Sequence, residues 1–179
     1  MSLVSNLFLL FVAAAVIVYY LVPARWQWLV LLGFSYIYYI AGGIRYVGFL
    51  LFSTFVTWLT ALAIEKMETA GKHKTAGKFV ILGLVLNFGM LGLAKYTNFA
   101  IENLNALFHM NLRGMQILLP LGISFYTFQS SGYILDVYWK RCKAEHNPLK
   151  YALFVSFFPQ ILQGPIGRYS RLANQFYAP

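Results

Sequence analysis

Long apolar runs alternate with short polar segments along the first half of the chain. Apolar residues dominate residues 3–22, 26–44, 46–64 and 79–94. A run of about 20 residues forms a helix of about 30 Å, which matches the hydrocarbon core of a bilayer. The pattern therefore predicts one transmembrane helix for each run, with a tight connection at Pro23 and another at Gly42-Gly43.

Polar stretches separate and follow these runs. Residues 65–78 hold four lysines and two glutamates, and we expect a hydrophilic loop there. Residues 95–116 mix apolar and polar positions, which indicates an amphipathic helix at the membrane surface. A second basic loop follows residue 138. The predicted fold is all-α, a multi-pass transmembrane helical bundle in a single domain.

The centre of the chain combines an apolar helix with polar side chains in its middle. No proline interrupts residues 121–138, and Pro120 suits the first turn of a helix. One polar stripe recurs at helical spacing along this segment: Tyr126, Gln129, Tyr133 and Asp136. Because polar groups in hydrocarbon need partners, we expect this helix inside a bundle or beside water. The stripe either joins neighbouring helices or lines a pathway.

The apolar segment at residues 151–162 cannot be a simple span. It contains Pro159, and Gly164-Pro165 follows it directly. About 12 residues are too few to cross a bilayer as a helix. The sequence predicts a re-entrant or broken segment near residues 159–164, which is tolerated only where protein or water covers the freed backbone groups.

Composition and charge agree with a membrane protein. The chain is 60% hydrophobic and 11% charged, whereas soluble proteins carry about a quarter charged residues. The net charge is +9, but the basic residues lie between the apolar runs and form neither a basic helix nor a nucleic-acid-binding module. Lipid, and not nucleic acid, is therefore the expected partner.

The basic residues also predict an orientation. With the amino terminus outside, nine of them fall on the inner side: Arg25, the four lysines of residues 65–78, Lys140, Arg141, Lys143 and Lys150. Only Arg45, Lys95 and Arg113 fall on the outer side. We therefore predict an outside amino terminus, in the cytoplasmic (inner) membrane if the chain is bacterial.

No complete active site is visible in the residues. The chain has no glycine-rich phosphate loop and no nucleophile elbow. His73, His109 and His146 lie far apart without the spacing of metal ligands, so no metal site is expected. Cys142 is the only cysteine, which excludes an intrachain disulfide. Spacing alone indicates a polar-lined membrane bundle and no more.

Several motifs together resemble one family. They are residues 95–99 (KYTNF), residues 119–125 (LPLGISF), Tyr133, residues 136–138 (DVY), Phe158-Pro159, Gly164-Pro165-Ile166 and Arg168. This set is similar to that of the membrane-bound O-acyltransferases, in particular their alginate O-acetyltransferase branch. The lipoteichoic acid D-alanyl transferase is a more distant resemblance.

The resemblance implies a ring of helices around a funnel and transfer of an acyl group across the membrane. The implied donor is a cytoplasmic acyl thioester, acetyl-CoA above all, and no cofactor stays bound. The implied acceptor is a hydroxyl of an exopolysaccharide or cell-wall glycan, reached directly or through an extracytoplasmic acetyltransferase partner. The family's intramembrane histidine, a general base, lies beyond Pro179. We therefore expect residues 1–179 to be the amino-terminal part of the acyltransferase domain and inactive alone.

The resemblance also suggests roles for the residues picked out above. The funnel-lining candidates are Tyr126, Gln129, Tyr133 and Asp136. The residues of the re-entrant motif are Pro159, Gln160, Gln163, Gly164, Pro165 and Arg168, and Arg168 could meet a phosphate or carboxylate of the donor. Asp136 could instead pair with a basic residue, and Arg168 could extend to a lipid headgroup. Two other functions stay open, a small transporter subunit and a non-catalytic membrane scaffold.

Overall fold

The computed structural model describes residues 6–108, 122–163 and 167–177. These ranges contain helices and no strand, so the predicted all-α class is confirmed for them. The helices are α1 (Asn6–Leu21), α2 (Ala24–Gly42), α3 (Ile44–Thr69), α4 (His73–Phe108), α5 (Ile123–Tyr138), α6 (Pro148–Ser156), α7 (Phe158–Gln163) and α8 (Tyr169–Tyr177).

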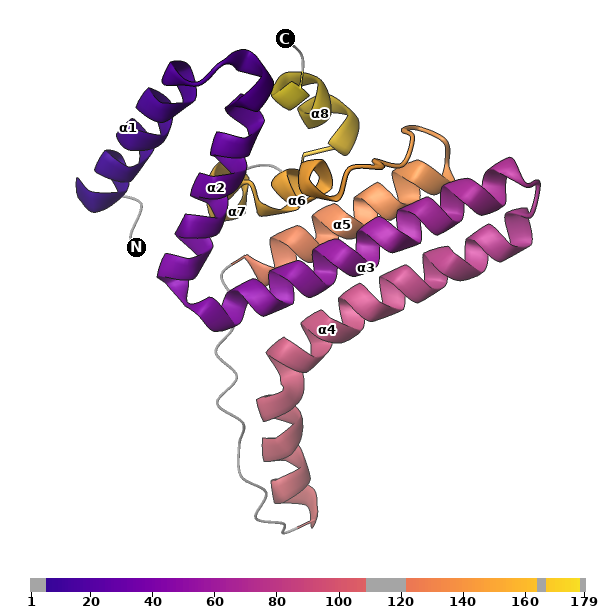
Figure 1. The fold of residues 1–179 in the computed structure, drawn as a ribbon. Helices are drawn as coiled ribbons and strands as arrows, with labels where there is room; N and C mark the ends of the chain where they lie inside the picture. The colour runs from indigo at the N-terminus through magenta and orange to yellow at the C-terminus, as the bar shows by residue number, and fades with distance from the viewer. Residues whose placement is uncertain (1–5, 109–121, 164–166, 178–179) are drawn as a thin grey trace.

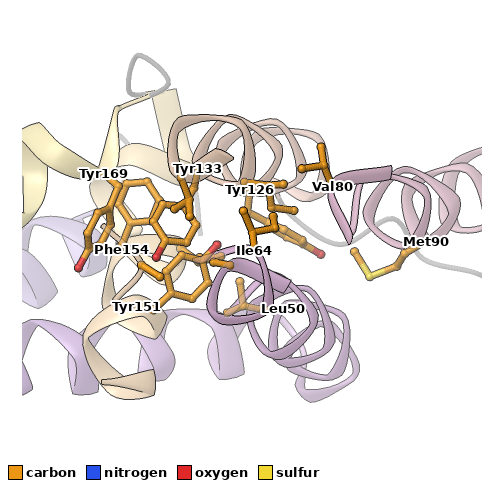
Figure 2. Close-up of a cluster of buried hydrophobic side chains, with 14 of the residues drawn as sticks. Leu50, Ile64, Val80, Met90, Tyr126, Tyr133, Tyr151, Phe154 and Tyr169 are labelled. Carbon is orange, nitrogen blue, oxygen red and sulfur yellow. The ribbon is translucent and has the colours of Figure 1, made fainter. Parts of the chain in front are cut away.

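Three helices form the centre of the fold. The first part of α4 and the whole of α5 run beside α3, and each of the three contacts the other two (Figure 1). Large buried side chains from all three helices meet between them, including Leu50, Ile64, Val80 and Tyr126 (Figure 2). Gly83 allows this close approach, because a Cβ there would lie 2.7 Å from Thr60 Cγ2.

The remaining helices lie at one end and along one side of this bundle. α1 and α2 lie beside one another, and α2 contacts α6, α7 and α8 (Figure 1). Aromatic rings join α1 to this group, since Phe11 lies 5.3 Å from Phe34 and 5.5 Å from Phe158 between ring centroids. The short helices α6 and α7 are thereby held against α5, where the polar stripe lies.

Two helices are long and apolar enough to cross a membrane, over Tyr46–Thr69 and His73–Thr97. α1 is apolar but has only 16 residues. Many large apolar side chains on the outer faces are exposed, among them Leu10, Phe55, Ile81 and Leu93. An apolar surface of this extent is typical of a protein that contacts lipid.

The predicted hydrophilic loop at residues 65–78 is wrong. α3 continues to Thr69 and α4 begins at His73, so the connection is three residues long. Glu65 to Glu68 are good helix formers, and charge at the end of a span does not stop a helix. Gly71, at φ 71°, makes the turn. The polar residues after Lys95 continue α4, whose second part bends away from α3 and α5 (Figure 1).

The predicted break near Pro159 is present, but it falls two residues earlier. α6 ends at Ser156, Phe157 leaves the helical conformation with φ −55° and ψ 104°, and α7 begins at Phe158. A continuous helix would place the Pro159 ring against the carbonyl group of Val155. The chain avoids this clash because Pro159 lies in the first turn of a new helix, where no N–H is needed. Asn147 begins α6 by accepting from the backbone N–H of Leu149 at 3.0 Å.

Candidate functional site

The polar stripe of α5 faces the interior. All four of its residues are buried, with exposed fractions of 0% to 9%. On the other side of the helix Phe125 and Phe128 are 41% and 48% exposed. The stripe therefore avoids the outer, apolar surface, as the cost of placing polar groups in hydrocarbon requires.

Gln129 joins α5 to the broken segment. Its Nε2 group donates to the carbonyl oxygen of Phe154 at 3.0 Å and to Gln160 Oε1 at 3.1 Å. Phe154 belongs to α6 and Gln160 to α7, so one amide holds both sides of the break. Gly167 allows the Gln160 side chain to lie there, because a Cβ on residue 167 would be 2.5 Å from Gln160 Nε2.

Tyr133 lies in an aromatic cluster built from α5, α6 and α8 (Figure 2). Its ring stacks on Tyr151 with centroids 4.7 Å apart and meets Tyr169 at 4.9 Å. Its hydroxyl oxygen accepts from the backbone N–H of Glu145 at 2.7 Å. This environment fixes the direction of the phenol.

Glu145 connects the loop at residues 139–147 to three helices. Its carbonyl oxygen accepts from Trp58 Nε1 of α3 at 2.8 Å, and its carboxylate accepts from the hydroxyl of Tyr169 at 2.5 Å. Its backbone N–H reaches Tyr133 of α5. Glu145 is not among the predicted site residues, because a glutamate in a basic loop gives no signal that distinguishes it from a solvated side chain.

A cavity of about 250 Å³ lies along the second half of the stripe. Gln129, Tyr133 and Asp136 line it together with Arg168. The Asp136 carboxylate also pairs with the Arg141 guanidinium at 3.5 Å, as one of the two roles considered for it requires. Arg168 is exposed and forms no ion pair with the described residues. The structure thus brings three of the four stripe residues and Arg168 to one polar cavity.

The other predicted site residues lie elsewhere. Tyr126 is fully buried, does not line this cavity, and its hydroxyl has no hydrogen-bond partner among the described residues. Pro159 lines a separate apolar pocket of about 340 Å³ between α1, α2 and α7. The side chain of Gln163, and Gly164 and Pro165, lie outside the described residues.

The described histidines lie away from the cavity. His73 Nδ1 lies 2.7 Å from the Glu68 carboxylate, and His146 Nε2 lies 2.9 Å from that of Glu65. His109 lies outside the described residues. Within residues 6–108, 122–163 and 167–177, no three potential ligands gather as a metal site would need.

The turn after α5 holds a lysine in a backbone conformation that usually takes glycine. Lys140 has φ 58°, while its N–H bonds to the carbonyl of Val137 and the N–H of Arg141 bonds to that of Asp136. The Lys140 ammonium lies 3.0 Å from the Glu68 carboxylate at the end of α3. This contact offsets part of the cost of the left-handed conformation.

Over the residues that the structure describes, these features define a helical, membrane-associated protein whose central helix turns polar groups toward a small cavity. The chain is 39% identical over 180 residues to the probable alginate O-acetylase AlgI of Pseudomonas aeruginosa, covering 96% of this chain and 34% of that protein. It is 38% identical over 181 residues to the probable alginate O-acetylase AlgI of Azotobacter vinelandii, covering 96% and 35%.

A relative with another named acceptor is also similar. The peptidoglycan O-acetyltransferase of Helicobacter pylori is 32% identical over 173 residues, which is 83% of this chain and 32% of that protein. The chain thus spans about one third of the length of the curated relatives it matches. No protein-family model matches it, and no solved structure matches it significantly. The chain is homologous to the alginate O-acetylases, the branch of the membrane-bound O-acyltransferases that its motifs resemble.

Proposed function

We propose that the chain forms part of a membrane O-acyltransferase that moves an acetyl group from a thioester donor to hydroxyl groups of an extracytoplasmic polysaccharide or cell-wall glycan. The observation that carries this proposal is the polar cavity beside α5, in a chain 39% identical to a probable alginate O-acetylase. A thioester and a sugar hydroxyl are both polar reactants, and they need a path through the membrane region that is lined by polar groups.

The proposed topology is multi-pass, in the inner membrane, with the amino terminus outside. Basic residues gather at one end of the α3–α4–α5 bundle, where Lys72 lies in the α3–α4 connection, Lys74 lies in the first turn of α4, and Lys140 and Lys143 follow α5. The pair between Lys140 and Glu68 brings these two connections together. An excess of basic residues favours the cytoplasmic side, so the cavity lies nearer the cytoplasm.

The proposed donor is acetyl-CoA or another acyl thioester that binds transiently. The proposed acceptor is a glycan hydroxyl, acetylated directly or through an extracytoplasmic acetyltransferase partner. Relatives named for alginate and for peptidoglycan support acetyl transfer to a glycan and leave the choice of glycan to experiment.

The experiment uses membranes from cells that produce the protein at its natural length. They are incubated with acetyl-labelled acetyl-CoA and with purified exopolysaccharide or peptidoglycan. We expect label in the glycan that mild alkali releases, as an O-acetyl ester, and that membranes lacking the gene do not produce. Membranes that contain the folded protein but transfer no label to either glycan would contradict the proposal.

A further inference from the structure

An open apolar groove of about 500 Å³ lies between α3 and α4. Every residue that lines it is apolar or glycine, and its side chains Phe52, Val85 and Leu93 are 46%, 60% and 70% exposed. Gly48 and Gly89 leave the space open, because a Cβ at either position would meet nothing within 4 Å. An exposed apolar hollow of this kind is typical of a site that an apolar partner occupies.

The groove lies in one half of the two apolar spans. Its α3 residues, 48–52, are near the start of the span Tyr46–Thr69, and its α4 residues, 85–93, are near the end of the span His73–Thr97. Both helices therefore place it away from the α3–α4 connection, in the outer leaflet of the proposed topology. Residues 85–93 cover about 12 Å of helix axis, close to the depth of about 15 Å that one leaflet contributes to the hydrocarbon core.

A cation stands at the end of the groove that faces the membrane surface. Lys95 follows the lining residue Leu93 by two positions, is exposed, and forms no ion pair with the described residues. Its ammonium lies 5.5 Å from the centre of the Tyr96 ring. Tyr96 shares one side of α4 with Gly89 and Leu93, at steps of four and three residues. The second part of α4 bends away from the bundle in this region (Figure 1), so Lys95 and Tyr96 suit the level of lipid headgroups.

The shape of the groove favours a hydrocarbon chain over another helix. Transmembrane helices approach one another where small residues form the contact surface. Here the glycines are accompanied by bulky exposed side chains, among them Phe52 and Leu93, which would hold a second helix away. A volume of about 500 Å³ holds roughly 17 groups of the size of a water molecule, at about 30 Å³ each. Because a methylene group is similar in size, the groove suits one acyl chain of a membrane lipid.

We propose that the α3–α4 groove binds an anionic phospholipid, with one acyl chain between the two helices and the phosphate at Lys95. Tyr96 then lies beside the ester region of the lipid, where an aromatic ring with a hydroxyl group is favourable. The inference goes beyond the proposed function and does not depend on acyl transfer; only the choice of leaflet follows from the proposed topology. It also gives a role to the first two residues of the motif at residues 95–99, which do not line the polar cavity.

The first test identifies the occupant by photo-cross-linking. The photoreactive residue p-benzoylphenylalanine replaces Phe52 in the groove or, as the matched control, Phe55, which is 59% exposed one turn further along α3 and outside the groove. The natural-length protein is exchanged exhaustively into detergent micelles, irradiated and analysed by mass spectrometry. We expect a phospholipid adduct at position 52 and none at position 55. Equal adducts at both positions, no lipid adduct, or a cross-link from position 52 to another protein segment or a second copy would overturn the inference.

The second test measures affinity by native mass spectrometry of the lipid-depleted protein, titrated with 16-carbon phosphatidylglycerol or phosphatidylcholine. Lys95→Gln should bind phosphatidylglycerol roughly fivefold more weakly and lose the preference for it over phosphatidylcholine. Lys78→Gln, which removes an exposed lysine of α4 outside the groove, should bind as wild type does.

Filling the groove separates the acyl-chain contact from the charge. Gly89→Leu should lose tight binding of both lipids, because the new side chain takes the place of the acyl chain. Gly33→Leu is the matched control: Gly33 is exposed on α2, does not line the groove, and has equally open space at its Cβ. Melting temperatures no lower than that of wild type confirm that the variants are folded. Equal lipid affinity of the two leucine variants, or of Lys95→Gln and wild type, would contradict the proposed site.

Discussion

Replacing Asn87 by alanine should destabilise the α3–α4 pair more than its size suggests. Asn87 is fully buried in the middle of an apolar span. Its Oδ1 accepts from the Ser53 hydroxyl at 2.6 Å, and its Nδ2 donates to Thr57 Oγ1 at 3.0 Å and to the carbonyl of Gly83 at 2.9 Å. Two of these three bonds join α4 to α3. The substitution removes all of them together.

The expected loss in the free energy of unfolding is about 2 kcal/mol. Hydrogen bonds between helices in membranes contribute about 0.6 kcal/mol each on average, and up to about 1.7 kcal/mol. The two interhelical bonds of Asn87 therefore account for about 1.2 kcal/mol. A void of roughly 25 Å³ adds about 0.6 kcal/mol at about 24 cal/mol per Å³.

The assay is reversible unfolding by SDS in mixed micelles, followed by circular dichroism. Asn103→Ala is the matched control, because Asn103 is exposed on the same helix and its Nδ2 donates to the carbonyl of Phe99 within α4. The control gains the same helix propensity and should change stability by less than about 0.5 kcal/mol. A double-mutant cycle of Asn87→Ala with Ser53→Ala should show coupling of at least about 0.5 kcal/mol. Equal losses for the two asparagines, with no coupling, would refute the reasoning.

Three further predictions concern the loop and the helix ends. Burial, with smaller contributions from neighbouring carboxylates, raises the pKa of the Cys142 thiol to about 11. About 0.1% of this thiol is therefore thiolate at pH 8, against about a quarter of an ordinary thiol. The rate of its alkylation, measured by mass spectrometry, should rise about tenfold per pH unit from pH 8 to 10, and a plateau below pH 9 would contradict this. Gly122→Ala should lower the free energy of unfolding by about 2–4 kcal/mol, because φ is 72° and the new Cβ would lie 2.3 Å from Ile161 Cγ2. In an Ile161→Ala background, Gly122→Ala should lower the free energy of unfolding by only about 1 kcal/mol. Tyr169→Phe removes the bond to the Glu145 carboxylate, so limited proteolysis should cut α8 faster than in wild type, and an unchanged rate would count against Glu145 as its anchor.

The spacing of polar and apolar residues along the sequence was enough to predict which side of α5 is buried. The cost of polar groups in hydrocarbon was sufficient to place the α5 stripe inside the molecule, because any other orientation would expose Gln129 and Asp136 to lipid. The same kind of reasoning predicted a break in the segment that contains Pro159. This reasoning placed the break at Pro159, whereas the break lies at Phe157. A proline is compatible with the first turn of a helix, so Pro159 stands near the start of α7 and not at the end of α6.

Contacts between distant segments could not be predicted in this way. The connection at residues 70–72 is short because α3 and α4 extend past the apolar runs into charged residues. Hydropathy marks only the apolar part of such a helix and therefore does not show where the helix ends. The role of Glu145 depends on Trp58, Tyr133 and Tyr169, which come from three different helices. No spacing along the chain links these residues, so only the packed structure shows that they meet beside the cavity.

Labelling of single cysteines tests most directly whether the polar side of α5 borders a hydrated cavity while the outer face of α3 and α4 contacts lipid. Gly132 lines the polar cavity and Gly89 lines an apolar groove, and a Cβ at either position would meet nothing within 4 Å. In a Cys142→Ser background, Gly132→Cys and Gly89→Cys therefore introduce thiols of equal size, one at the polar cavity and one at the apolar groove. A charged, water-soluble thiol reagent added to membranes should label the Gly132→Cys protein and leave the Gly89→Cys protein unlabelled. Labelling of Gly89→Cys but not Gly132→Cys, or of both equally, would contradict the account.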